Sequence, residues 1–65
     1  MTITFKECIG GQYIKQWPNW IGVIPNIGDK IILHYGDNAE EEEHYFVTAR
    51  AIDGTKPDNI DIYVS

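Results

Sequence analysis

Turn residues divide this chain into short segments, and that division limits the folds it can adopt. Clusters of glycine, proline and asparagine recur about every dozen residues, and between them apolar and polar residues alternate as they do in half-buried strands. In the clearest segment, Ile31, Leu33 and Tyr35 share one face and Ile32 and His34 the other. The expected strands are 2–7, 13–17, 30–35, about 44–52 and 60–64. The pattern predicts an all-β fold, a small antiparallel sheet that closes into a barrel or sandwich.

The segment 37–52 allows two interpretations. Asn38 is a good helix cap and the glutamates after it suit a helix N-terminus, which gives an α+β alternative with a short helix near 39–50. Against this, 45–48 is rich in strand formers, and a helix would bring Glu40 and Glu43 close together. We therefore expect a solvated glutamate loop followed by a strand.

The length of 65 residues predicts a single β domain spanning 1–65. Hydrophobic residues make up 43% of the chain, which is typical of a folded protein. Cys8 is the only cysteine, so no internal disulfide forms, and we expect it to be a buried, inert thiol. The sequence shows no signal peptide or membrane-spanning run, which predicts a cytoplasmic location.

The charge pattern argues against two classes of partner. Ten acidic residues outnumber five basic ones, giving a net charge of −5. The basic residues are spread along the chain, whereas phosphate backbones are bound by clustered lysine and arginine. We therefore expect no direct binding of nucleic acid and no binding to anionic membranes.

The segment 24–33 resembles the strand opening of many SH3-like small barrels. In those proteins a Pro-x-x-Gly-Asp turn precedes a β-branched strand, and here Pro25-Asn26-Ile27-Gly28-Asp29 is followed by Lys30-Ile31-Ile32-Leu33. The resemblance covers roughly the C-terminal two thirds and implies an SH3-like barrel more than a function, because such barrels have many roles. The basic loops of the RNA-binding members have no counterpart, since the matching loop, 37–43, is acidic.

The segment Trp17-Pro18-Asn19-Trp20 is the most unusual motif. Tryptophan is favoured at binding hot spots, so Trp17 and Trp20, together with Tyr35, are the candidate protein-binding residues. The alternative is that the rings fill the core of a very small protein. At a turn, we expect one ring to be buried and the other exposed.

Acidic residues between the third and fourth expected strands form a second candidate surface: Asp37, Glu40, Glu41, Glu42 and Glu43. Consecutive residues of an extended chain point to alternate sides, so these carboxylates and His44 do not converge as cation ligands. A solvated acidic patch is the expected structure, with no metal and no cofactor.

No spacing of nucleophile, base or paired carboxylates suggests catalysis, so we expect a non-enzymatic protein. The sequence favours a protein-interaction module or small accessory subunit that binds another protein or a second copy of itself. The alternative is an acidic decoy, whose carboxylates imitate nucleic-acid phosphates and occupy a basic site on a nucleic-acid-binding protein.

Overall fold

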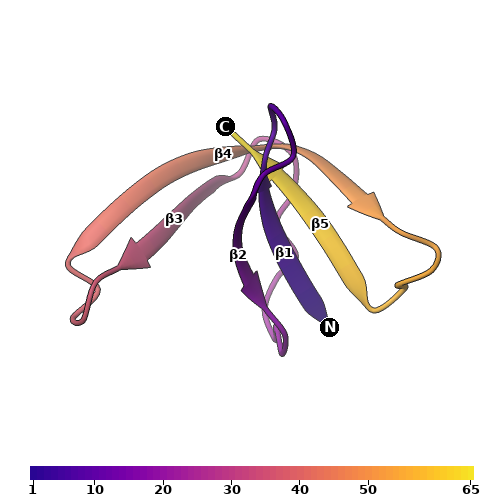
Figure 1. Ribbon diagram of the computed structural model, residues 1–65, viewed down its shortest axis with the longest axis horizontal. Coiled ribbons are helices and arrows are strands. Elements are labelled where there is room, and N and C mark those ends of the chain that lie inside the picture. Colours follow the sequence, from indigo (N-terminus) through magenta and orange to yellow (C-terminus); the bar gives the residue numbers. More distant parts are fainter.

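The computed structural model describes all residues, 1–65, and consists of five strands without a helix (Figure 1). The strands are β1 (Thr2–Glu7), β2 (Tyr13–Trp17), β3 (Lys30–Tyr35), β4 (Glu41–Ile52) and β5 (Asn59–Val64). They form one curled sheet in the order β2-β1-β5-β4-β3, a half-barrel. The all-β prediction is confirmed, and the helix alternative near 39–50 is wrong because those residues lie mostly in β4. No helix of the protein is long and apolar enough to span a membrane.

The two terminal strands are neighbours and run parallel, which corrects the expectation of a purely antiparallel sheet. Ile3 lies beside Ile60 and Phe5 beside Ile62, whereas the other three strand pairs are antiparallel. Alternation within a segment does not reveal this pairing, because it joins residues at opposite ends of the chain. The parallel pair forms the centre of the sheet.

β4 is longer than expected, because it begins at Glu41 and includes three glutamates assigned to a loop. These glutamates pair with the second half of β3, from Leu33 to Tyr35. The strand accommodates them because their side chains stay in water. The first half of β4 pairs with β3, and Val47 and the residues after it pair with β5, so that β4 spans the longest dimension of the molecule in Figure 1. A bulge between Val47 and Ala49 changes which face the following side chains occupy.

The core lies on one face of β1, β5 and the middle of β4. It consists of six buried side chains that are at most 7% exposed: Ile3, Phe5, Val47, Ile60, Ile62 and Val64. All come from alternate strand positions, as the sequence pattern requires. Burial of side chains this size stabilises the fold by about 1.5–3 kcal/mol each.

The segment 18–29 contains no strand but covers this core, since Trp20 and Ile24 pack against it and Pro25 is buried. The segment ends in a tight turn. Asp29 donates its amide to the Asn26 carbonyl at 3.0 Å, and its carboxylate accepts the Asn26 amide at 2.8 Å. Gly28 has a φ of 95°, which favours glycine. The Pro-x-x-Gly-Asp sequence therefore forms the turn that leads into β3.

Candidate functional site

The two tryptophans lie in contact at the end of β2. Their ring centroids are 5.8 Å apart with an interplanar angle of 71°, and Trp17 meets the core ring of Phe5 edge-on at 5.6 Å. Pro18 follows β2 immediately and lacks an amide hydrogen for the sheet. The chain turns there, and Trp20 comes back against Trp17.

Tyr35 joins this cluster through a residue that the sequence analysis did not select. The Lys15 ammonium lies 4.8 Å from the centroid of the Trp17 ring and 5.4 Å from that of Tyr35. It also donates to the His34 carbonyl at 3.4 Å. Lys15 thus spans the opening between β2 and β3, the two edge strands. Cation–π contacts of this kind need no pattern in the sequence, so no signal pointed to Lys15.

Both tryptophans are half-buried, whereas one buried and one exposed ring was expected. Each packs against the core, and both line a shallow hollow of about 240 Å³ with Asn19, Ile21 and Gly22. The Trp20 indole donates to the Val23 carbonyl at 3.3 Å, which fixes the ring against its own loop. One face of each ring therefore packs against the core, and another remains accessible.

Large apolar side chains are left in water next to this hollow and elsewhere. Ile21 is 98% exposed and Val23 is 84% exposed. Across the molecule the exposed large hydrophobic residues are Met1, Ile9, Tyr13, Ile21, Val23, Ile27, Ile32, Phe46 and Ile52. No sequence pattern indicates this surface, because an apolar residue in a short loop looks the same in the sequence whether the fold covers or exposes it.

The acidic residues are distributed over two faces of the β3–β4 ribbon and its turn. Glu41 and Glu43 lie opposite Tyr35 and Leu33 on one face, and Glu42 lies opposite His34 on the other. Asp37 and Glu40 belong to the connecting turn.

Glu42 and Glu43 each have a side-chain partner. Glu43 accepts a hydrogen bond from the Tyr45 hydroxyl. Glu42 lies 2.9 Å from His44 and 3.9 Å from His34. The hydrogen bond to His44 is the main reason that the pKa of Glu42 is below its ordinary value. Although His34, Glu42 and His44 are neighbours, no three metal-ligating side chains are arranged to hold an ion.

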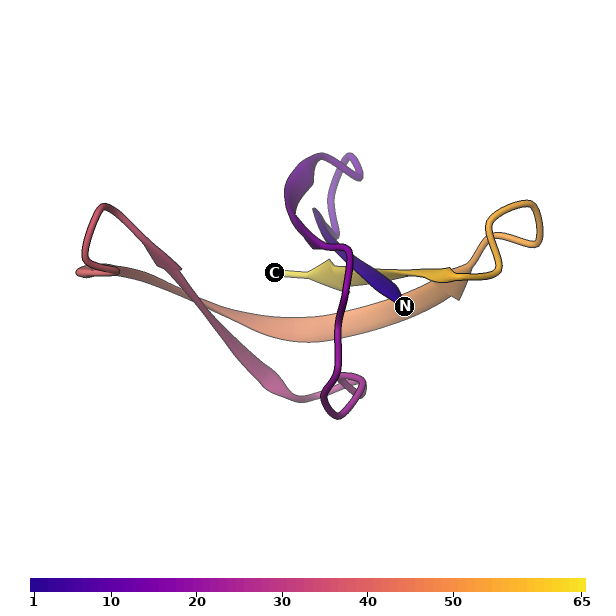
Figure 2. The ribbon, with the colours of Figure 1, turned by 90° about the horizontal axis from the view of Figure 1, so that it is seen from below.

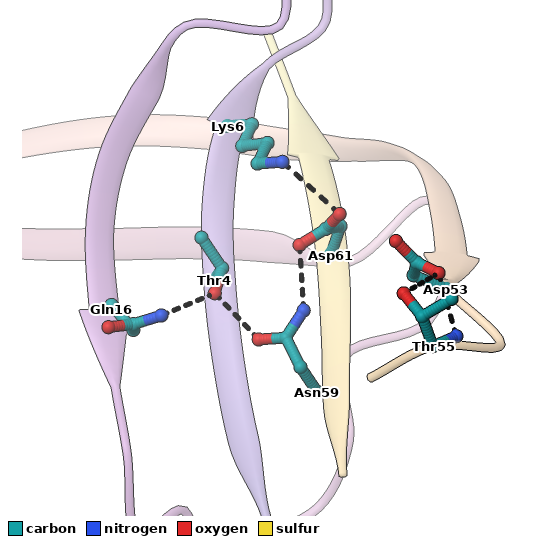
Figure 3. A network of polar contacts seen from close by, with 7 residues as sticks. All are labelled: Thr4, Lys6, Gln16, Asp53, Thr55, Asn59 and Asp61. Carbon is teal, nitrogen blue, oxygen red and sulfur yellow. Dashed lines mark hydrogen bonds and ion pairs between the residues drawn. The ribbon is translucent and has the colours of Figure 1, made fainter. Parts of the chain in front are cut away.

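A polar hollow of about 500 Å³ lies on the opposite side of β1 and β5 from the core. Figure 3 shows its hydrogen-bond network, in which Gln16 donates to Thr4 at 3.1 Å and Thr4 donates to Asn59 at 2.8 Å. Asn59 donates in turn to Asp61 at 2.9 Å, and Lys6 binds the other oxygen of that carboxylate at 3.2 Å. Thr4 is only 5% exposed, so the network satisfies a buried polar group at the centre of the sheet.

The loop 53–58 forms one wall of this hollow and β2 the other, and Figure 2 shows both rising on the same side of the sheet. Asp53 stabilises the loop by accepting hydrogen bonds from the backbone and the hydroxyl of Thr55. The backbone bond is the main reason that the pKa of Asp53 is lowered. Every buried side-chain nitrogen and oxygen of the protein has a hydrogen-bond partner, so no buried polar atom of this network is left unpaired.

Cys8 is exposed, which corrects the expectation of a buried thiol. It follows β1 at the start of the turn to β2, where the chain leaves the sheet. Alternation along β1 places residues 3 and 5 in the core but does not extend into that turn.

Comparison with protein-family models, with curated proteins and with solved structures found no match for this chain.

Proposed function

We propose that this protein is a small non-enzymatic interaction module or accessory subunit that binds another protein through exposed apolar side chains. The main support is local: Ile21, which is 98% exposed, lines the hollow with Trp17 and Trp20, and Val23, which is 84% exposed, accepts the indole hydrogen bond of Trp20. Across the chain, nine large hydrophobic residues are exposed and seven hydrophobic residues are buried. In a monomeric soluble protein, large apolar patches are rare and commonly mark interaction sites.

The accessible surface area of the molecule also supports this proposal. It is 4525 Å², whereas a compact monomer of 7.4 kDa has about 4,200 Å². The principal extents of 36 × 24 × 21 Å describe an elongated molecule. Its half-barrel shape leaves surface in water that a closed barrel of this size buries.

The proposed partner surface is the hollow formed by Trp17, Trp20 and Ile21, extended by Val23. Tryptophan provides a large, rigid contact area at low cost in conformational entropy, which favours it at interface centres. Here the Trp17–Trp20 contact and the bond from Trp20 to Val23 hold both rings in place before a partner binds. A preorganised apolar hollow with exposed aliphatic neighbours suits an apolar side chain of another protein.

We also propose that the fold is related to SH3-like barrels, which is supported by the turn 25–29. A cytoplasmic location remains a prediction. The acidic-decoy alternative has less support, because Glu42 faces the opposite side of the ribbon from Glu41 and Glu43.

The test is affinity capture from extracts of the source organism, with mass spectrometry of the bound proteins. The double variant Ile21→Ser/Val23→Ser changes two side chains that the fold does not bury, and Ile9→Ser is a matched control on the turn between β1 and β2. We expect a partner that wild type and Ile9→Ser retain and the double variant loses. Equal capture by all three baits, or capture that disappears with moderate salt, would reject the proposal; the second result would favour the acidic decoy.

A further inference from the structure

β3 is an edge strand with unpaired backbone groups, and the hydrogen bonds around it show which groups these are. Phe46 of β4 exchanges both of its backbone hydrogen bonds with Ser65, at 2.9 and 3.0 Å. It therefore makes none with Lys30, the residue opposite it on β3. In an antiparallel ladder, bonded and unbonded positions alternate, so Lys30, Ile32 and His34 direct their amides and carbonyls to the free edge. The His34 carbonyl is consistent with this assignment, because it accepts a hydrogen bond from the Lys15 side chain and not from β4.

The side chains of these same three residues share one face of the β3–β4 ribbon. Lys30 lies opposite Phe46, Ile32 opposite His44, and His34 opposite Glu42. All six side chains are exposed, including Ile32 at 44% and Phe46 at 55%. The free edge and an uncovered face thus coincide on one short segment.

We infer that a second copy of this chain pairs antiparallel with β3, centred on Ile32. Ile32 then faces Ile32 of the other copy, and Lys30 faces the other copy's His34. This register places outward-directed residues opposite each other, so the amides and carbonyls of Lys30, Ile32 and His34 pair across the axis. The His34 carbonyl, which already accepts from Lys15, accepts there through its second lone pair. It also keeps each side chain on the same face across the two-fold axis, and the contact is isologous. The inference goes beyond the proposed function, which concerns another protein and the hollow at Trp17 and Trp20.

Charge complementarity favours this register over its neighbours. Glu42 lies beside His34 on the same face, with 3.9 Å between its carboxylate and the imidazole. Pairing centred on Ile32 brings the ammonium of Lys30 from one copy next to the His34–Glu42 pair of the other. A shift by two residues in the C-terminal direction would place Lys30 opposite Gly36 and lose this contact. Because the axis is two-fold, the attraction occurs twice.

The other edge strand lacks these properties. β2 has five residues, and Lys15 projects from it across the Trp17 and Tyr35 rings. A lysine directed inward from an edge strand is a common protection against edge-to-edge pairing. β3 carries Ile31, Ile32 and Leu33 in succession, so its edge is the favourable one for a second chain.

The first experiment is sedimentation equilibrium over a wide concentration series. We expect the apparent mass of wild type to rise from 7.4 kDa toward twice that value. Ile32→Pro removes an amide that the monomer does not use, and proline is tolerated at such edge positions. This variant should remain monomeric throughout, whereas the matched control Ile32→Val should dimerise like wild type. A wild type that stays monomeric, or an Ile32→Pro variant that dimerises normally, overturns the inference.

The second experiment tests the register and does not depend on the fold tolerating proline. In a Cys8→Ser background, Ile32→Cys should form a disulfide-linked dimer on mild oxidation, because directly opposite residues have Cα atoms about 5.5 Å apart. Ile9→Cys in the same background is the exposed control and should cross-link far more slowly. Equal cross-linking of both variants contradicts the register.

Charge exchange tests the same register in solution. Lys30→Glu should weaken dimerisation by placing two carboxylates together, and adding Glu42→Lys should restore it. Failure of the restoration rejects the charge pairing. None of these variants alters the hollow at Trp20 and Ile21, so a failed dimer leaves partner capture unaffected and the two proposals are tested separately.

Discussion

Thr4 of β1 donates a 2.8 Å hydrogen bond to Asn59 of β5, joining the two strands that form the parallel centre of the sheet. The two residues are 55 positions apart. Thr4 also accepts a bond from Gln16 of β2, so its hydroxyl connects three adjacent strands. A polar group that is 5% exposed is destabilising without such partners, and the network therefore favours this strand arrangement over others.

Replacing Thr4 by valine should destabilise the protein by about 1–3 kcal/mol, because the shape is kept while the Asn59 carbonyl and the Gln16 amide lose their partner. Urea unfolding followed by circular dichroism measures this change. Thr48→Val is the matched control, since Thr48 is exposed and donates to Tyr63 at 3.2 Å; its effect should stay within about 0.5 kcal/mol. Equal effects of the two substitutions would contradict a structural role for the network.

The core should be sensitive to the loss of single methyl groups. Ile62 is fully buried, so Ile62→Val should cost about 0.5–1.5 kcal/mol and Ile62→Ala about 2–5 kcal/mol. Thermal and urea unfolding check both values, and Ile21→Ala at a 98% exposed position should have little effect. If Ile21→Ala were as destabilising as Ile62→Ala, the assignment of the buried and exposed faces would be wrong.

The Trp17–Trp20 contact should give a coupled signal in the far-ultraviolet circular dichroism spectrum, since the rings are 5.8 Å apart and strongly inclined. Either Trp17→Phe or Trp20→Phe should abolish that band, and Tyr13→Phe should leave it. Fluorescence quenching of the two single-tryptophan variants should show intermediate protection for both rings. A band that survives either tryptophan substitution would show that the rings are apart in solution.

Tyr45 should ionise only at high pH. Its hydrogen bond to Glu43, with a smaller contribution from burial, raises its pKa from 10.0 to about 12. The folded state favours the neutral phenol, so this contribution to stability is present below pH 10 and is lost as the pH rises toward 12. A spectrophotometric titration of tyrosinate should lose its highest-pH phase in Tyr45→Phe, and Glu43→Gln should move that phase to lower pH. Loss of a phase near pH 10 instead would contradict the assignment.

Local sequence patterns were sufficient to predict where the strands lie but not which strands pair with each other. Apolar and polar residues alternate in 2–7, 30–35 and 60–64, as expected for half-buried strands, and the structure buries one apolar face of each, including Ile3, Leu33 and Ile62. The parallel β1–β5 pairing was not predictable, because it depends on which apolar faces fit together once the chain has folded. The length of β4 was missed for a related reason: pairing with β3 outweighs the low strand propensity of Glu41 to Glu43.

The candidate surfaces were predicted in part. The sequence shows two tryptophans on either side of Pro18-Asn19, and in the structure their rings are in contact. The contact of Lys15 with Tyr35 and the polar hollow could not be predicted, because both depend on contacts between strands that are distant in the sequence. The exposure of Ile21 and Val23 could not be predicted from the sequence either, because it depends on the half-barrel leaving one side of the segment 18–29 uncovered.

We propose that this chain, as a monomer, leaves binding surface exposed to water, most clearly at the free edge of β3. Amide hydrogen exchange measured by NMR at low and high protein concentration tests it directly. We predict that the Ile32 and His34 amides exchange rapidly in dilute solution and become protected in concentrated solution, while the Leu33 and Ile62 amides are protected in both. Equal protection of Ile32 and Leu33 in dilute solution would show that the β3 edge is already paired within the monomer and would contradict the account.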